Sequence, residues 1–239
     1  MPTKLTWNGH SNVRIACEAA AILIDPFFEG NPTAPIPASE AGPADVVCVT
    51  HAHGDHLGSA LAVCRATGAT LVAMPEICEK LVADGLPESQ TIGMNIGGTV
   101  ELKGCRIKMV QAVHSSPFGA PAGFILTLPD GLCCYHAGDT GLFSSMELFS
   151  VFHTIHLALL PIDGHYNMDA RQAAYACRLL KCGRVVPIHW GTFPILAQGT
   201  GEFRAALEEL APDTMFTELR PGESLSLPSP GPAGDCGCE

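Results

Sequence analysis

The chain has 239 residues, of which 47% are hydrophobic, and its 24 acidic residues against 13 lysines and arginines give a formal net charge of −11. This length suits one domain, and we expect it to span residues 1–228, with a tail at 229–239. The acidic balance argues against a nucleic-acid partner, because phosphate backbones are bound by clustered Lys and Arg. The longest apolar runs are strand-length, well short of the roughly 20 residues that a membrane-spanning helix needs, so no membrane partner is expected.

The N-terminus and the cysteines both indicate the compartment. The first residues, Met-Pro-Thr-Lys-Leu-Thr-Trp, lack the apolar segment and cleavage site of a signal peptide, which favours the cytoplasm. The 11 cysteines are odd in number, and most lie within apolar stretches, as Cys48 and Cys177 do. We interpret them as reduced core thiols rather than a disulfide framework.

The first half of the chain predicts strands followed by alternating strands and helices. Strands at 4–7, 12–17 and 20–25 are separated by turn-like residues and indicate an antiparallel meander. Residues 26–43 are rich in Pro, Gly and Ala, which predicts a long loop with Phe27 and Phe28 available for exposure. The patterns that follow predict strands at 46–50 and 70–74 and helices at 57–67 and 75–84.

The second half repeats this arrangement. Strands are expected at 99–102, 106–113, 123–128, 132–136, 155–161, 184–189 and 215–219, and helices at 143–149, 169–180 and 202–210. Asp169 is a plausible cap for the second of these helices. Two such blocks in one chain predict an α/β fold, a four-layer αββα sandwich of two mixed sheets flanked by helices. Loops at one edge of both sheets then converge, so distant residues can meet in one site.

Residues 51–56 read His-Ala-His-Gly-Asp-His and directly follow the predicted strand 46–50. Side chains of an extended segment repeat with period two, so His51 and His53 point the same way and can share one metal ion. Asp55 and His56 fall beyond a turn eased by Gly54, where they can reach a second ion. The alternative interpretation is a solvated His-rich loop, and distant ligands that complete both coordination shells would argue against it.

Three residues just past predicted strand ends supply such ligands. His114 follows strand 106–113, Asp139 follows strand 132–136, and His189 ends strand 184–189. Together with the hexapeptide they give seven ligands, a number that fits two zinc-type ions sharing a carboxylate. We assign His51, His53 and His114 to one ion and Asp55, His56 and His189 to the other, with Asp139 bridging. Zn is the favoured metal, with Mn, Fe or Ni as alternatives, and Asp55 is also expected to orient the nucleophile.

The order of these motifs resembles that of the metallo-β-lactamase-fold superfamily. The resemblance rests on His-x-His-x-Asp-His at 51–56, His114, Ala-Gly-Asp-Thr at 137–140 and His-Trp-Gly at 189–191. Within the superfamily, Trp-Asn-Gly-His-Ser at 7–11, Leu-Ile-Asp-Pro at 23–26 and Ile-His-Trp-Gly-Thr-Phe at 188–193 are similar to compact uncharacterised metal-dependent hydrolases related to ascorbate-6-phosphate lactonase. The resemblance implies no particular substrate. Residues 163–168 depart from the Gly-Asp-containing loop expected in close relatives.

Four further residues are site candidates. His10 recurs at the matching position of that branch, and two roles stay open for it: catalytic stabilisation of a developing charge in the site, or a structural hydrogen bond. Asp25 is expected to orient a ligand His rather than to bind metal. His136 and His165 are candidates for substrate binding.

The function predicted from these residues is metal-dependent hydrolysis, in which a hydroxide shared by two ions cleaves a small ester, lactone, phosphoester or amide. One alternative is an iron-dependent oxidoreductase of the sulfur dioxygenase type on the same fold. Diiron members of the fold typically resemble His-x-Glu-x-Asp-His and carry a flavin module, whereas this chain has His53 at the Glu position and no room for that module. A non-catalytic, metal-stabilised binding module is the other alternative. The expected partners are a small-molecule substrate and a second copy of the chain, for which the 26–43 loop is a candidate contact.

Overall fold

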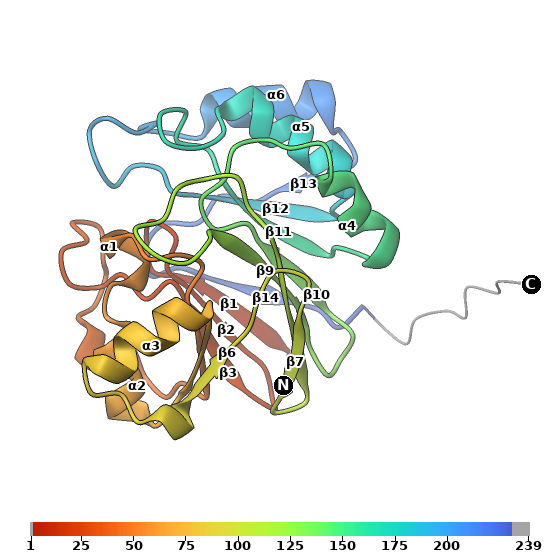
Figure 1. Ribbon diagram of the computed structural model, residues 1–239. Coiled ribbons are helices and arrows are strands. Elements are labelled where there is room, and N and C mark those ends of the chain that lie inside the picture. The colour runs from red at the N-terminus through yellow and green to blue at the C-terminus, as the bar shows by residue number, and fades with distance from the viewer. Residues whose placement is uncertain (1, 231–239) are drawn as a thin grey trace, which may run out of the picture.

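Two seven-stranded sheets lie at the centre of the protein, in a computed structural model that describes residues 2–230. The tail expected at 229–239 lies outside the described residues, apart from Ser229 and Pro230. The two sheets stack face to face, and helices cover the outer side of each (Figure 1). This arrangement confirms the predicted αββα sandwich.

The first sheet combines an antiparallel and a parallel half. Its strands, in spatial order, are β14 (Ser224–Leu227), β1 (Thr3–Trp7), β2 (Val13–Ala16), β3 (Ala21–Ile24), β4 (Val46–Cys48), β5 (Thr70–Ala73) and β6 (Thr91–Gly93). The meander β1-β2-β3 is antiparallel, as predicted, and β3 to β6 pair in parallel. All three residues of β4 are buried, which is why this parallel strand is a continuous apolar run.

The second sheet is built in the same way. Its strands, in spatial order, are β13 (Met215–Phe216), β12 (Arg184–Ile188), β11 (Leu157–Pro161), β10 (Cys133–His136), β9 (Ala122–Thr127), β8 (Cys105–Gln111) and β7 (Thr99–Leu102). Strands β7 to β10 pair antiparallel, and β10 to β13 pair in parallel. Strands β1 to β6, joined by β14 from near the end of the chain, thus form the first mixed sheet, and strands β7 to β13 form the second.

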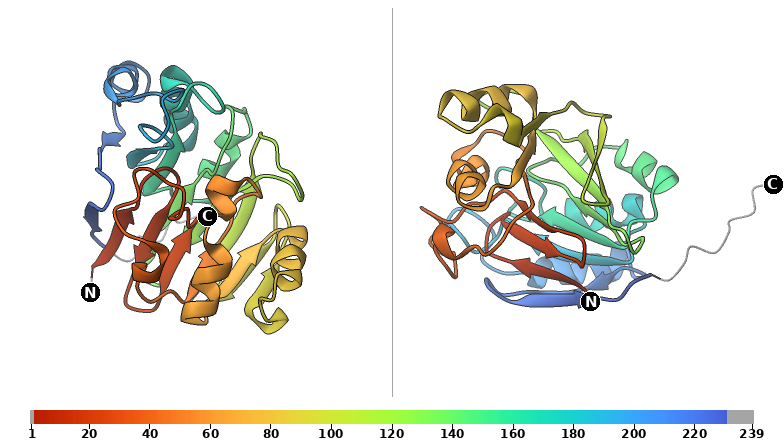
Figure 2. Two further views of the ribbon diagram at one scale, coloured as in Figure 1. Left: turned by 90° about the vertical axis from the view of Figure 1, so that its left-hand side faces the viewer. Right: turned by 90° about the horizontal axis from the view of Figure 1, so that it is seen from below.

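The helices are divided between the two outer faces. Helices α1 (Gly54–Leu57), α2 (Ala60–Thr67) and α3 (Pro75–Ala83) flank the first sheet, and α4 (Met146–Phe152), α5 (Ala170–Leu180) and α6 (Gly201–Leu210) flank the second (Figures 1 and 2). Short 3₁₀ turns occur at Ala38–Glu40 and Glu88–Gln90. Asp169 caps α5 by accepting the Gln172 backbone N–H, and the Asp169 backbone N–H donates in turn to the Gln172 side-chain oxygen. This capping box confirms the predicted helix start.

Three local predictions need correction. No strand is predicted after residue 219, yet β14 pairs with β1, with Leu227 facing the core at 4% exposure. The helix expected at 57–67 is two helices, because Gly58 takes a positive φ of 40° next to the backbone of Phe27. Phe27 and Phe28 are only 7% and 3% exposed, so the 26–43 loop packs its aromatic side chains inward.

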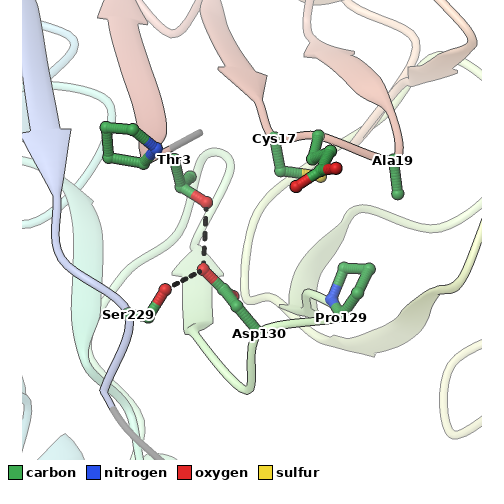
Figure 3. A pocket seen from close by; sticks show the side chains of 8 residues that line it. Thr3, Cys17, Ala19, Pro129, Asp130 and Ser229 are labelled. Carbon is green, nitrogen blue, oxygen red and sulfur yellow. Dashed lines mark hydrogen bonds between the residues drawn. The ribbon is translucent and has the colours of Figure 1, made fainter.

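A hollow of about 830 Å³ lies at the end of β1 away from Trp7. On its lining, Asp130 in the β9–β10 turn accepts hydrogen bonds from the Thr3 hydroxyl at 3.3 Å and the Ser229 hydroxyl at 3.0 Å (Figure 3). These bonds hold the segment after β14 against the second sheet. Ser229 is therefore held to the turn between β9 and β10.

The cysteines agree with their interpretation as reduced core thiols. All nine cysteines among the described residues are unpaired, and eight of them are buried. Between residues 2 and 230, no helix is both long and apolar enough to cross a bilayer.

Candidate metal centre

The predicted ligands converge at one edge of the sandwich. The hexapeptide 51–56 follows β4 of the first sheet, whereas His114, Asp139 and His189 follow β8, β10 and β12 of the second. Because strand ends from both sheets meet there, residues separated by more than one hundred positions lie side by side. The sequence prediction that loops of both sheets form one site is thus met by the geometry.

His51, His53 and His114 form the first group of donors. His51 Nε2 lies 2.8 Å from His53 Nδ1, and the ligand atoms of all three residues lie within 4.8 Å of one another. His53 has an extended backbone, with φ −66° and ψ 150°, and it is the residue before α1. Gly54 is the first residue of α1 and has no left-handed conformation, so the expected glycine turn is a helix start instead.

Asp55, His56 and His189 form the second group, together with His10. Their ligand atoms also lie within 4.8 Å of one another. Asp55 Oδ2 is 3.9 Å from His56 Nε2 and 4.0 Å from His189 Nε2. Asp55 and His56 lie on the first turn of α1, which places both side chains toward the second sheet.

Asp139 lies between the two groups. Its Oδ1 is 3.3 Å from His56 Nε2, and its Oδ2 is 3.2 Å from His189 Nε2 and 3.6 Å from His114 Nε2. Gly138 makes this position accessible: it has a φ of +61°, and a Cβ there would approach the Ala122 carbonyl to 2.8 Å. Asp139 thus contacts donors of both groups, and its ligand atom also lies within 4.8 Å of those of His51 and His56 in a third set of donors.

The charges and unpaired atoms of this cluster fit divalent cations. His56 Nε2, His189 Nε2 and Asp139 Oδ1 are buried without a hydrogen-bond partner among the described residues. Unsatisfied buried polar atoms of this kind are costly unless an ion or water completes them. Imidazole nitrogens and carboxylate oxygens are the donors that zinc-type ions take in proteins.

The pKa values of the imidazoles reflect the buried carboxylates around them. Burial lowers the pKa of His51 to about 3, so its ring is neutral, as a metal ligand must be. Burial also acts on His56 and His189, but Asp139 outweighs it and raises the pKa of His189 to about 9 and that of His56 well above its usual value. Without an ion, protons on these two rings balance the carboxylate charge that a divalent cation would otherwise balance.

Asp25 and Thr50 orient the first ligands, as expected for Asp25. The His56 Nδ1–H donates to Asp25 Oδ2 at 2.8 Å, which directs Nε2 into the cluster. Asp25 also accepts the Thr50 hydroxyl at 2.7 Å, and the same Thr50 oxygen lies 3.1 Å from His51 Nδ1. These contacts fix the tautomers and ring orientations of two ligands.

Asp163 lies beside the Nδ1 edge of His189, and the sequence prediction left its loop unassigned. Its Oδ2 lies 3.1 Å from His189 Nδ1, while Oδ1 accepts the backbone N–H groups of His165 and Tyr166 at 2.9 and 2.7 Å. The carboxylate therefore links a ligand to the 163–168 loop. Its position two residues past the end of β11 matches the strand-end rule that located the other ligands.

His10 lies beneath Asp55 and is fully buried. Its Nε2 is 3.0 Å from Asp55 Oδ2, and its Nδ1 is 3.0 Å from the Thr192 hydroxyl. Burial lowers the pKa of His10 to about 4, so the neutral ring donates Nε2–H to the carboxylate. Burial raises the pKa of Asp55, but this hydrogen bond together with the charges of His56 and His10 outweighs it and leaves that pKa below its usual range. The geometry thus favours a hydrogen-bonding role for His10.

The two histidines expected to contact substrate lie elsewhere. His136 has no exposed surface, and its ring nitrogens bond to the Ser11 carbonyl at 2.9 Å and the Gly138 N–H at 3.1 Å. Its place within β10 turns the side chain into the interior, so no nitrogen is free for a ligand. His165 is exposed and packs edge-on against Tyr166, with ring centroids 4.5 Å apart, and it is Tyr166 that faces the pocket.

A pocket of about 430 Å³ opens over the donor cluster. Its floor includes five of the predicted ligands, namely His53, Asp55, His114, Asp139 and His189. The remaining lining residues are Ser115, Tyr166, Phe193, Ile195 and Leu196. These five residues lie on loops whose direction is decided by tertiary contacts.

Comparisons with known proteins agree with this geometry. The beta-lactamase superfamily domain matches residues 20–190. A UPF0173 metal-dependent hydrolase of Nitratidesulfovibrio vulgaris is 52% identical over 230 residues, covering 95% of this chain and 96% of the relative. A protein of the same name from Caldivirga maquilingensis is 43% identical over 94% of this chain and 98% of its own length.

Among solved structures, the novel metallo hydrolase Igni18 of the archaeon Ignicoccus hospitalis superposes with a TM-score of 0.87. It is 38% identical in sequence, and the match covers 95% of this chain and 99% of that one. The predicted superfamily resemblance is confirmed by these matches together with the two-sheet fold. The chain belongs to the metallo-β-lactamase superfamily and, within it, to the UPF0173 metal-dependent hydrolases.

Proposed function

We propose that this protein is a dinuclear hydrolase that cleaves a small ester, lactone, phosphoester or amide with a hydroxide shared between two metal ions. The observation that carries the proposal is the position of Asp139, whose carboxylate contacts His114 of the first donor group and His56 and His189 of the second. A carboxylate placed between two His-rich groups is the usual bridge of a two-metal site.

Each donor group holds one ion in this proposal. The first ion takes His51, His53 and His114, and the second takes Asp55, His56 and His189, with Asp139 shared. Five of these seven donors are imidazoles, which suits zinc and also accommodates Mn, Fe or Ni. With three protein donors and a shared carboxylate, a five-coordinate ion would keep one position for water or substrate, as a catalytic rather than a structural site requires.

The two ions would lower the pKa of a shared water to about 7 and polarise the substrate oxygen. The residues of the chain position and protonate the reactants. Asp55 lines the pocket with 30% of its side chain exposed and stays ionised, so it can orient the attacking water and accept its proton. His10 holds Asp55 in that orientation through the 3.0 Å hydrogen bond, and it is therefore a positioning residue.

Metal analysis followed by a hydrolysis screen tests the proposal. Purified protein should bind divalent metal, and the loaded protein should hydrolyse at least one compound in a panel of esters, lactones, phosphoesters and amides. Asp55→Ala should abolish the activity and lower the affinity for the second ion. Asp213→Ala, at an exposed carboxylate before β13, should change neither the activity nor the affinity. Failure to bind divalent metal would overturn the proposal, as would oxygen uptake with persulfides by the iron-loaded protein.

A further inference from the structure

The pocket over the donor cluster has two chemically different sides. The floor is made of five predicted ligands, and the wall is made of Tyr166, Phe193, Ile195 and Leu196 together with the small polar residue Ser115. Leu196 is 4% exposed, while Tyr166 and Ile195 are 57% and 54% exposed at the mouth. A ligand that reaches the floor must therefore pass and contact apolar surface.

The wall is held in place by hydrogen bonds between its two loops. The Ala197 N–H donates to the Asp163 carbonyl at 3.0 Å, and the Gly191 N–H donates to the Ala197 carbonyl at 2.8 Å. The Gln198 side chain donates to the carbonyls of Phe193 and Leu196 at 2.8 and 2.7 Å. Because the backbone is fixed from both sides, the wall is formed before a ligand arrives.

No Lys or Arg lines this pocket, although every Lys and Arg of the chain lies within residues 2–230. Several of these side chains bond backbone carbonyls remote from the donor cluster: Arg14 to Ala41, Arg65 to Gly85 and Lys108 to Gly97. Protein sites for phosphate or carboxylate groups rely on such cations, most often on Arg with its paired N–H donors. Apart from the ions, nothing on this wall would balance an anionic substituent, which would lose its hydration on entering.

We infer that the substrate is an uncharged acyl compound, an ester, lactone or amide, whose compact apolar group packs between Tyr166, Phe193 and Ile195. This inference rests on the proposed hydrolase function and narrows its substrate class by setting phosphoesters aside. In the reaction, the oxygen of water bonds to the acyl carbon as the acyl C–O or C–N bond breaks. The proton of that water passes to the leaving oxygen or nitrogen, so the products are an acid and an alcohol or amine.

Two esters of nearly equal size distinguish the effect of substrate charge on turnover from the effect of substrate shape. p-Nitrophenyl butyrate and mono-p-nitrophenyl succinate release the same phenolate, but only the succinate carries a carboxylate. For the metal-loaded protein we expect kcat/KM to be at least tenfold higher for the butyrate. Bis(p-nitrophenyl) phosphate, an anionic phosphoester, should be hydrolysed more slowly than either.

Variants of the wall residues test whether the wall causes the preference for the uncharged ester. Ile195→Arg should reduce the ratio of butyrate to succinate kcat/KM at least fivefold by supplying a cation. Met215→Arg adds the same charge at a residue of similar exposure, 55%, beside the far end of β12, and should leave the ratio unchanged. Phe193→Ala should raise KM for the butyrate more than for p-nitrophenyl acetate, because the longer acyl chain loses more contact.

The outcomes are distinguishable from failure of the proposed function. Equal or preferred turnover of the succinate or the phosphodiester overturns the inference about substrate class and leaves two-metal hydrolysis standing. An unchanged ratio in Ile195→Arg overturns the assignment of the wall. If protein with bound metal turns over none of the four compounds and no lactone or amide of the wider panel, both proposals are overturned.

Discussion

His10 Nε2 lies 3.0 Å from Asp55 Oδ2, a contact between the loop after the first strand and the metal-binding hexapeptide. The same loop is joined to the segment after β12, because the His189 N–H donates to the His10 carbonyl at 3.0 Å and the two rings lie 3.8 Å apart. The Trp7 indole N–H also donates to the His10 carbonyl, at 2.8 Å. Asp55 is thus positioned by the N-terminal loop as well as by its own helix.

Replacing His10 should lower activity through Asp55. We expect His10→Ala to reduce kcat about 10- to 100-fold and to weaken the second ion, since residues that orient ligands have effects of this size. His10→Gln should recover part of the loss, because its amide N–H can still donate to the carboxylate. The measurements are steady-state kinetics and metal titration of both variants. Equal loss in both, with unchanged metal affinity, would contradict the positioning role.

Asp25→Asn should weaken metal binding while leaving the fold intact. The amide keeps the shape of the carboxyl but removes the charge that accepts the His56 Nδ1–H at 2.8 Å. We expect the affinity for the divalent ion to fall about 10- to 100-fold, measured by competition with a chromophoric chelator. Asp213→Asn is the matched control at an exposed carboxylate and should bind metal as the natural protein does. An unchanged metal affinity in Asp25→Asn would indicate that Asp25 only accepts the Thr50 hydrogen bond and does not orient His56 for metal binding.

Metal removal should make stability depend on pH in a defined window. In the metal-free protein the pKa of His189 is raised to about 9, since Asp139 outweighs the effect of burial, against 6.5 in the unfolded chain. The protonated ring therefore stabilises the fold fully below pH 6.5, and this contribution is lost as the pH rises through 9. His56, whose pKa is also raised, acts with the same sign.

Thermal unfolding with and without chelator checks this dependence. The melting temperature of the chelated protein should decrease as the pH is raised from 6.5 to 9. The melting temperature of the zinc-loaded protein should decrease less over the same pH range. His10 and His51 do not obscure the result, because their pKa values are lowered by burial to about 4 and about 3, so their contributions change below pH 6.5. A metal-free midpoint that stays level or rises from pH 6.5 to 9 would contradict the described charge arrangement.

The last strand should contribute measurably to stability. Leu227 is 4% exposed and pairs with Thr3 across β14 and β1, so Leu227→Ala should lower the free energy of unfolding by about 2–3 kcal/mol. Ser226→Ala, whose side chain is exposed on the same strand, should stay within about 0.5 kcal/mol of the natural protein in urea denaturation. Equal stability of the two variants would mean that β14 does not pack as described.

The residues that converge at the candidate site could be predicted because their signal is local. Each ligand or cluster directly follows an apolar run that predicts a strand, and strand ends meet at one edge of a sandwich. β14 and β6 were missed because Ser224–Leu227 and Thr91–Gly93 are short and lie among Pro, Gly and polar residues, where pairing depends on a distant partner strand. The branch relation to a lactonase stays a prediction.

The pocket wall and the orienting residues depended on three-dimensional packing. Tyr166 faces the pocket, while His165 beside it does not. Their orientations follow from the loop conformation, in which the backbone N–H groups of both residues donate to the Asp163 carboxylate. His136 is buried because the position it occupies in β10 faces the interior. Histidine composition alone gave no means to separate these structural residues from ligands.

The number of metal ions per chain tests the central claim most directly. Elemental analysis of protein dialysed against a small excess of zinc should give two equivalents for the natural protein and close to one for His53→Ala and for His189→Ala, since each variant removes a donor of a different group. The double variant His53→Ala/His189→Ala should retain less than one. Saturation of the natural protein at a single equivalent would contradict a dinuclear centre.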